Sequence, residues 1–452
     1  MKEQDGQGHD LPSFARYLNK VFGFRQAVAK LTDSRTNPEI STASVFLSVF
    51  HAFVFRLRSF QQLERELGQP GLQRWVGAPR AFSDDVFRYS LCGFQLSGLE
   101  QMMVDMNRKL KRNKAFDQGR VQGRIVAAVD GIEVLSGSSR CCERCLERKV
   151  KVKKAGVKVE QTQYYHRAVG CQIISGPVKT FLAFEWFQPG EGEDTTALRL
   201  LNKLPQMYGS RMFDILVLDA LYAQSPVLKL AADKGWDVVI SLKQNNRELY
   251  QSAIRLFAHR DPDVRGEEQH KGKKYCFQIW DTIGLPFAIH DDTPVRVIRS
   301  EESVTQNHWR ERSPQPETTE HEWVWVTTLD QQAFPPMVVR RLGHDRWKQE
   351  NNGWDDLTQN WAFKHGFLHA CRHRPRTEAD NGERVPVANR GLAAVALIAL
   401  LAFNLCSAFI HCHSKLVRLH RLPTIEVARQ LQRSVSDLPP RIRSPDCPAP
   451  AV

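Results

Sequence analysis

The fold is decided by residues 125–131, IVAAVDG, in which a short apolar run leads directly into Asp130. An uninterrupted apolar run of this length that ends at a polar residue is typical of a strand buried on both faces. Residues 213–218 form a second run of the same kind, which leads into Asp219. The sequence therefore predicts two buried strands, each ending at an aspartate.

Strands and helices alternate around these two runs. Further strands are predicted over 164–174, 179–187 and 237–242, and helices over 193–208, 225–234 and 246–257. Residues 175–177, Ser-Gly-Pro, supply turn chemistry between the first two of these strands. Three adjacent strands followed by alternating helices and strands indicate an α/β fold, with a mixed sheet flanked by helices.

The first 120 residues are predicted to be helical. Ser41 and Ser83 can each cap a helix, and the apolar periodicity after Ser41 continues to Val54. Residues 108–114, RKLKRNK, form a basic segment. Such a segment is compatible with a solvated helix face and equally with a phosphate-contacting surface. We expect residues 1–120 to form a helical N-terminal DNA-binding region.

A different pattern occupies residues 262–330. Solvent-facing antiparallel strands are predicted there by alternating polar and apolar side chains over 275–280, 295–299 and 323–328. Residues 300–320 are predicted to be a polar linker. We interpret 262–330 as a β-rich insertion between two parts of the core, 121–261 and 331–415.

The C-terminal region contains the most apolar stretch of the chain. Residues 391–412 carry no formal charge over 22 positions, a length that can cross a bilayer. The six alanines in this stretch, and Asn404 inside it, favour instead a helix buried in a large core. After it, residues 416–452 are basic and become rich in Pro, Ser and Arg, which predicts a partly disordered tail.

The composition excludes several classes of protein, and the net charge indicates the kind of partner. The 452 residues carry 63 Lys+Arg against 50 Asp+Glu, a net charge of +13, and 42% of them are hydrophobic. This composition excludes a mostly disordered, collagenous or coiled-coil chain, and ten cysteines are too few for a disulfide scaffold. The positive charge indicates a polyanionic partner, nucleic acid before an acidic membrane surface.

Three carboxylates have positions that suit a divalent-metal site. An α/β sheet places its ligands beyond the carboxyl ends of its strands, where Asp130 and Asp219 are predicted to lie. Mg²⁺ takes carboxylate oxygens, and two such ions can serve a phosphoryl transfer. Glu350 is the preferred third carboxylate, from a predicted helix on which Arg346 shares its face, and Asp345, Asp355 and Asp356 are nearby alternatives for this role. Either aspartate alone is also compatible with a turn or a helix cap.

Taken in order, VAAVDG at Asp130, ILVLDALYA at Asp219 and RWKQENNGW at Glu350 resemble the DDE transposases of bacterial insertion sequences. The resemblance covers residues 30–415 and includes the segments YYHR and PGEGE. It implies a ribonuclease H-like core that is interrupted by strands between the second Asp and the Glu. The carboxylates are separated by 89 and 131 residues, and the second interval leaves room for that insertion.

Carried over residue by residue, the resemblance implies that Asp130, Asp219 and Glu350 are the catalytic residues and bind two Mg²⁺ ions. Mn²⁺ is expected to substitute for Mg²⁺. The resemblance also implies that Arg346 faces the DNA.

The chain departs from the family signature at two positions. Gly343 stands where a Tyr precedes the Arg, and Leu357 stands where a Lys follows the Glu. The roles of those two groups in positioning DNA then fall to other residues, for which Lys348, Lys364 and Lys243 are candidates.

The resemblance implies a DNA transposase with endonuclease activity. It would hydrolyse phosphodiesters at the ends of an insertion sequence and join the 3′ hydroxyl to target DNA. Its partner is then double-stranded DNA, in the terminal inverted repeats and in the target, bound by a homodimer on paired ends. The expected location is the bacterial cytoplasm, at the nucleoid and not at a membrane. Because two signature residues are missing, a catalytically inert DNA-binding protein derived from a transposase is the alternative.

A second metal site is compatible with the cysteines. Cys141, Cys142 and Cys145, with His166 about twenty residues further on, are the ligand types of a structural zinc site. One Cys-x-x-Cys is common by chance, and the second pair of ligands is not clear from the sequence. Reduced cysteines in a solvated loop are therefore the simpler interpretation, and a Zn²⁺ site is the alternative.

A basic run follows these cysteines. Residues 148–154 read RKVKVKK. We expect Lys151, Lys153 and Lys154 to contact DNA phosphates from a loop.

Overall fold

The computed structural model describes the chain over residues 10–138, 142, 144–154, 156–243, 247–270, 272–287, 293–310, 313–365, 367–368, 390–413 and 422–436. The chain divides into two compact units, and each unit is discontinuous in sequence. Unit 1 comprises Met1–Leu110, Val134–His166 and Asp356–Val452. Unit 2 comprises Lys111–Glu133 and Arg167–Asp355.

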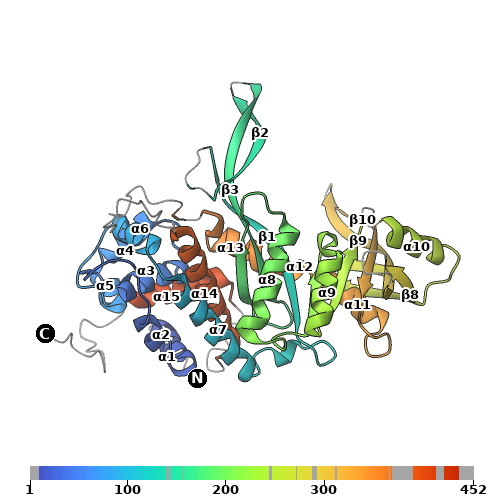
Figure 1. Ribbon diagram of the computed structural model, residues 1–452, viewed down its shortest axis with the longest axis horizontal. Coiled ribbons are helices and arrows are strands. Elements are labelled where there is room, and N and C mark those ends of the chain that lie inside the picture. The colour runs from blue at the N-terminus through green and yellow to red at the C-terminus, as the bar shows by residue number, and fades with distance from the viewer. Residues whose placement is uncertain are drawn as a thin grey trace, which may run out of the picture. The chain divides into compact units, whose positions relative to one another are not determined.

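The N-terminal part of unit 1 is helical, as expected. Its helices are α1 (Asp10–Phe22), α2 (Phe24–Ala29), α3 (Thr42–Val54), α4 (Phe60–Leu67), α5 (Pro70–Val76), α6 (Asp84–Cys92) and α7 (Leu96–Arg112) (Figure 1). The Ser41 hydroxyl caps α3 by accepting a hydrogen bond of 3.0 Å from the Ser44 amide, so that prediction is confirmed. Ser83 is the N-cap residue of α6, but its side chain makes no capping hydrogen bond.

Helix α14 (Gly391–Cys412) forms the centre of unit 1. It is long and apolar enough to cross a membrane, yet 94% of its most apolar window is buried among other parts of the chain. Phe409 packs edge-on against Phe14 with 5.0 Å between ring centroids, and the Tyr17 hydroxyl donates to the Ala408 carbonyl. This burial agrees with the interpretation of 391–412 as a core helix. Helix α15 (Thr424–Ser436) contacts α1 and α5.

Residues 148–154, expected in a loop, instead belong to a strand. Strand β2 (Leu146–Lys154) pairs antiparallel with the first part of β3 (Val157–Ile173), from Leu146 opposite Tyr165 to Lys154 opposite Val157. Figure 1 shows the two strands as a twisted ribbon. The loop prediction was wrong because valines alternate with lysines over 149–153, and this β pattern carries little apolar signal when both faces are solvated.

Unit 2 is organised around a mixed sheet. Its strands include β1 (Val126–Gly137), β4 (Thr180–Trp186), β5 (Ile215–Leu218), β6 (Asp237–Leu242), β7 (Val264–His270), β8 (Lys273–Phe287), β9 (Thr293–Arg310) and β10 (Ser313–Thr327). The order is β2-β3-β1-β5-β6-β10-β9-β8-β7, and β4 pairs with residues 168–173 of β3 outside this path. Only β1–β5 and β5–β6 are parallel among the described pairs with a known register. This is the expected ribonuclease H-like mixed sheet.

The β-rich segment continues this sheet. Residues 324–327 of β10 pair with 239–242 of β6, and β9 and β10 pair along their whole described length. Residues 300–320, predicted as a linker, therefore lie largely in strands, and that prediction was wrong. Their side chains are polar on both faces and pair across the strands, as in the 2.8 Å contact between the Thr305 and Thr318 hydroxyls. Such a strand lacks the apolar alternation that predicts strands.

Helices cover the sheet of unit 2 and carry the rest of the core. They are α8 (Glu193–Tyr208), α9 (Ser225–Lys234), α10 (Arg247–Phe257), α11 (Pro336–Asp345) and α12 (Trp347–Gln349). The next helix, α13 (Asp355–Asn360), belongs to unit 1 except for its first residue. Contacts join α8 to β4, α9 to β6, α10 to β8, and α11 to β6, β8 and β9 (Figure 1). The predicted bounds of α8, α9 and β6 match the observed ones.

A buried ionic network fixes α11 on the sheet. Glu302 of β9 accepts hydrogen bonds from Arg340 Nε at 3.0 Å and contacts His344 Nε2 at 2.8 Å. Burial raises the pKa of Glu302, but His344 and Arg340 together lower it to about 2. The carboxylate is thus charged at all ordinary pH values, and it orients the helix that leads to Glu350.

Candidate active site

Asp130 was predicted to lie at the end of its strand. It lies instead within β1. The strand continues to Gly137 because Ile132 and Val134 are also buried and extend its alternation. The parallel pairing with β5, however, ends at Ala128 opposite Val217. Asp130 therefore lies just beyond the part of β1 that the sheet encloses, where a ligand can reach it.

Asp219 directly follows β5, as predicted. It is the N-cap residue of the short 3₁₀ helix η2 (Ala220–Tyr222), although its side chain makes no capping hydrogen bond. Its carboxylate forms an ion pair with Lys243, at 3.3 Å. Both aspartates thus belong to the carboxyl-end side of the neighbouring parallel strands β1 and β5.

Glu350 begins a π-helical turn, η4 (Glu350–Trp354), between α12 and α13. Arg346 lies four residues earlier, and its Nη2 is 4.0 Å from Glu350 Oε2, so the predicted pairing on one face is a long ion pair. Arg346 is buried, whereas the Glu350 side chain is 44% exposed. π turns inside helices occur frequently at functional sites.

The π turn is attached to the sheet by direct contacts. Gln349 Nε2 donates to the Gly170 carbonyl of β3 at 2.7 Å. The Trp354 ring packs on Phe181 of β4 with 4.4 Å between centroids. A Cβ on Gly170 would lie 2.5 Å from the Trp354 ring, so a glycine is required where the turn meets β3. These contacts fix the backbone from which Glu350 extends.

Electrostatic coupling links Asp130 to Glu350, and it links Tyr222 to both aspartates. Burial raises the pKa of Asp130 to about 7, with Arg346 opposing this effect and the carboxylates of Glu193 and Glu350 adding to it. Burial also raises the pKa of Tyr222 well above its usual value, and Glu193, Asp130 and Asp219 contribute. Asp130 therefore lies within electrostatic range of Glu350, and the Tyr222 hydroxyl lies within range of both aspartates.

Glu193 is a further member of this cluster, although the sequence favoured interpreting it only as part of an acidic first helical turn. It occupies the acidic first turn of α8. Its Oε2 accepts a hydrogen bond of 2.6 Å from Arg167 Nη2, and its Oε1 accepts one of 2.9 Å from the Tyr222 hydroxyl. A Cβ on Gly131 would lie 2.6 Å from Glu193 Oε2. The glycine after Asp130, and the segments YYHR and PGEGE that supply Arg167 and Glu193, were the available signals.

The two departures from the transposase signature lie in the hydrophobic core. A Cβ on Gly343 would lie 2.3 Å from the Trp325 ring, so a tyrosine does not fit there. Leu357 is fully buried. Of the lysines considered as replacements, Lys243 pairs with Asp219, Lys348 pairs with Asp345 at 2.8 Å, and Lys364 is exposed.

The donor set of the carboxylate cluster fits divalent cations. Asp130 is hindered from ionising by burial and by two neighbouring carboxylates, a repulsion that a bound cation relieves. Asp130, Asp219 and Glu350 do not belong to a group whose ligand atoms all lie within 4.8 Å of one another.

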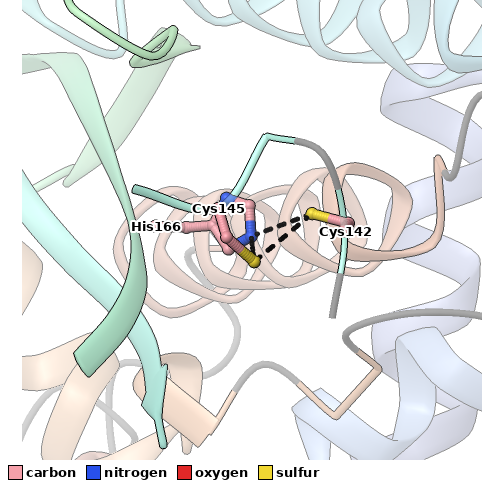
Figure 2. Close-up of side chains that lie close together, drawn as sticks. All are labelled: Cys142, Cys145 and His166. Atoms are coloured by element: carbon pink, nitrogen blue, oxygen red, sulfur yellow. Dashed lines mark hydrogen bonds between the residues drawn. The ribbon is translucent and has the colours of Figure 1, made fainter. Parts of the chain in front are cut away.

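The cysteines and His166 do form such a group. Among the described residues, Cys142, Cys145 and His166 are the group of three ligand atoms that lie within 4.8 Å of one another (Figure 2). Cys142 Sγ is 3.6 Å from Cys145 Sγ and 3.4 Å from His166 Nε2, and Cys145 Sγ is 3.7 Å from the same nitrogen. Burial, with the Cys145 thiol adding to it, raises the pKa of Cys142 to about 11. Cys141 lies outside the described residues.

The lysines expected to bind DNA lie along the β2–β3 ribbon. Lys149, Lys151 and Lys153 are exposed on one face, since side chains two apart on a strand share a face. Val150 and Val152 occupy the other face. The side chain of Lys154 lies outside the described part of the structure.

The sequence matches the profile of one protein family. The profile of the family described as "Transposase DDE domain" matches residues 122–354, just over half of the chain. No protein with a curated description matches the sequence. A solved structure, the cryo-EM structure of the piggyBac transposase synaptic complex with hairpin DNA, is similar at 12% identity and a TM-score of 0.38, over 95% of this chain and 82% of that one.

Proposed function

Because the chain belongs to the transposase DDE domain family, we propose that it cleaves phosphodiesters at the ends of an insertion sequence and joins the freed 3′ hydroxyl to target DNA. The observation that carries this proposal is the electrostatic coupling of Asp130 with Glu350 and of both aspartates with Tyr222. A cluster of carboxylates beyond the ends of parallel strands is suited to the metal ions that phosphoryl transfer needs.

The three carboxylates have distinct roles in the proposed site. Asp130 would hold metal together with Glu350, to which it is electrostatically coupled, and both aspartates act on the Tyr222 hydroxyl. When bound, two Mg²⁺ ions, or Mn²⁺ in their place, supply activation of the attacking oxygen and stabilisation of the leaving oxygen. Lys243, which pairs with Asp219 at 3.3 Å, would be the residue beside this aspartate that contacts a DNA phosphate. The catalytic residues are then Asp130, Asp219 and Glu350.

Other side chains position this set. Arg167 and Tyr222 hold Glu193 against the backbone of Gly131, next to Asp130. Arg346 offsets part of the negative charge around Asp130 and faces the scissile strand. Lys348 is a further phosphate contact from the same helix. We propose that the DNA is double-stranded, that a homodimer holds paired ends, and that the protein acts at the bacterial nucleoid in the cytoplasm.

The test is strand cleavage of a linear duplex that carries the terminal inverted repeats of the element. Wild-type protein with Mg²⁺ should cleave at the repeat end, and Asp219→Asn should lose at least about 100-fold in rate because a metal ligand is gone. Binding of the duplex, measured by gel retardation, should be unchanged. Asp233→Asn, on the outer part of α9, is the matched control and should cleave normally.

One observation favours a second candidate, an inert DNA-binding protein derived from a transposase. The Tyr and Lys positions of the signature are core positions here, Gly343 and Leu357, and neither can contact DNA. Binding without cleavage by both wild type and Asp219→Asn would support this candidate and refute the enzyme.

A further inference from the structure

A cluster of two thiols and one imidazole lies where the β2–β3 ribbon begins. We propose that Cys142, Cys145 and His166 bind one Zn²⁺ ion, and that this ion fixes the base of the lysine-bearing ribbon. The site is separate from the carboxylate cluster, which contains only oxygen ligands. The use of the ribbon on DNA rests on the proposed function, whereas the metal content does not.

The spacing of the three donor atoms matches a tetrahedral zinc ion. Bonds of about 2.3 Å to sulfur and about 2.0–2.1 Å to nitrogen, at tetrahedral angles, place two sulfurs about 3.8 Å apart and a sulfur and a nitrogen about 3.6 Å apart. The observed separations are 3.6 Å between the sulfurs, and 3.4 and 3.7 Å from the sulfurs to Nε2. Each agrees within about 0.2 Å, the tolerance expected of a real site.

The donor chemistry selects the ion. Thiolate and imidazole ligands favour Zn²⁺ over Mg²⁺ and Ca²⁺, which take oxygen. No disulfide joins Cys142 and Cys145. Figure 2 shows both sulfurs and the imidazole nitrogen directed toward a common point. Cys145 and His166 are buried, at 1% and 6% exposure, so the ion would be shielded from solvent on that side.

The three ligands connect the two strands of the ribbon at its base. Leu146 is the first residue of β2 and pairs with Tyr165 of β3. Cys145 comes directly before this pair on one strand, and His166 comes directly after it on the other. A metal ion held by both residues therefore adds a final cross-link to the antiparallel ladder, at the end opposite the turn.

The ribbon would gain stability from such a link toward its turn, although Arg148 near its base donates to Gln163 at 2.8 Å and lies over the Tyr165 ring. A two-stranded ribbon is at best marginally stable in water. Here Lys153 lies directly opposite Lys158, and both are exposed. Like charges directly opposite one another destabilise a sheet, and the ion pair between Lys149 and Glu160 is long, at 3.9 Å.

A two-stranded ribbon of this kind can enter the major groove of DNA. Lysines on one face can then contact the phosphates on the borders of the groove. The zinc ion would hold the ribbon in one orientation before binding, which reduces the entropy lost when the complex forms.

Elemental analysis of the purified full chain, dialysed against a weak chelator, tests the site. Wild type should retain about one zinc per chain. Cys142→Ser, Cys145→Ser and His166→Gln should each lose most of it. The matched controls are Cys276→Ser and His321→Gln, which lie on β8 and β10 away from the cluster, and they should keep the wild-type content. Folded wild type without zinc, or zinc unchanged in the three variants, would overturn the proposal.

Cobalt substitution serves where a variant fails to fold. Wild type loaded with Co²⁺ should show the visible bands of tetrahedral cobalt and a thiolate-to-cobalt charge-transfer band. An octahedral spectrum without charge transfer would refute thiolate ligation. A mass deficit that shows a Cys142–Cys145 disulfide in protein purified under reducing conditions would equally refute it.

Limited trypsin digestion tests the role on the ribbon without any DNA. Removal of zinc by a strong chelator should speed cleavage between Arg148 and Lys158 by about tenfold or more, because local opening becomes easier, while cleavage in α9 stays constant. Unchanged cleavage after zinc removal would refute the proposed zinc cross-link between β2 and β3. A protein that contains zinc but does not cleave DNA would refute only the proposed function. A zinc-free protein that cleaves DNA would refute only the zinc site.

Discussion

Asp130 holds its proton up to a pH of about 7, because it is buried and has Glu193 and Glu350 beside it, whereas an ordinary aspartate loses its proton near 3.8. Between these two pH values the native protein binds more protons than the unfolded chain. The free energy of unfolding of the metal-free protein therefore falls as the pH rises through this window. The metal-free carboxylate cluster is therefore a source of instability, which a bound cation would relieve.

Asp130→Asn should stabilise the metal-free protein. At pH 8 its free energy of unfolding should exceed that of wild type by about 2–4 kcal/mol, from a shift of about three pKa units, and near pH 4 the two should be equal. Urea unfolding at both pH values measures this. Mg²⁺ should raise the melting temperature of wild type and leave that of the variant unchanged. A variant less stable than wild type at pH 8 would contradict the account.

Glu193→Gln removes one of the charges that repel Asp130. The pKa of Asp130 should fall, so the DNA-cleavage rate at subsaturating Mg²⁺ should rise with pH about one unit earlier than in wild type. The pH–rate profile of cleavage measures the midpoint. Glu185→Gln on β4, whose carboxylate pairs with Arg199 and Lys203, is the control and should keep the wild-type midpoint. An unmoved midpoint in Glu193→Gln would mean that its charge does not act on Asp130.

The β2–β3 ribbon is the element on which DNA affinity is predicted to depend. Replacing Lys151 and Lys153 together with glutamine should lower the slope of log affinity against log salt by up to about two, since each phosphate contact contributes about 0.9. Fluorescence anisotropy of a labelled duplex at several salt concentrations measures this slope. Lys229→Gln with Lys234→Gln on α9 removes the same charge elsewhere and should leave the slope unchanged. Equal losses in both double variants would indicate only a net-charge effect.

Elements with an apolar side were predictable from the sequence. The bounds of α8 were correct because Gly192 and Gly209 flank a run with clear helical periodicity, and Gly235 ends α9 in the left-handed conformation. By contrast, β2, β7 and most of 300–320 were missed. Residues 300–320 and β7 contain few apolar residues, and the alternation of Val with Lys in β2 is confined to residues 149–153, so a strongly apolar face does not mark them as strands.

The site was predictable only in part, for a related reason. Asp219 follows a strand that its own apolar run defines, and so its position could be predicted. The approach of Glu193 to Gly131 and of His166 to the cysteines depends on tertiary structure and on the register of β2 with β3. Neither leaves a periodic signal in the sequence. Only the residue types, a glycine after the aspartate and a histidine after the cysteines, indicated where to look.

At the scale of the whole molecule, the most apolar segment is predicted to be indispensable to the fold. Ala399 of α14 is fully buried, and Ala399→Asp places an unpaired charge there. It should destabilise the protein by more than about 3 kcal/mol and reduce its soluble yield. Ala393→Asp is the matched control, since Ala393 is half-buried in the first helical turn, where the helix dipole favours a carboxylate. Thermal unfolding compares the two, and an Ala399→Asp variant as stable as wild type would refute the core role of α14.

Three helical partners of α14 come much earlier in the chain. It packs on α1, α3 and α6, which leave the ribosome some 300 residues before it does. Domains tend to fold from the N-terminus during synthesis. The helices on which this apolar helix packs can therefore be folded before α14 is translated. This shortens the time in which a membrane-insertion machinery could bind it. A rearranged gene that placed α14 first would lose that protection while encoding the same contacts.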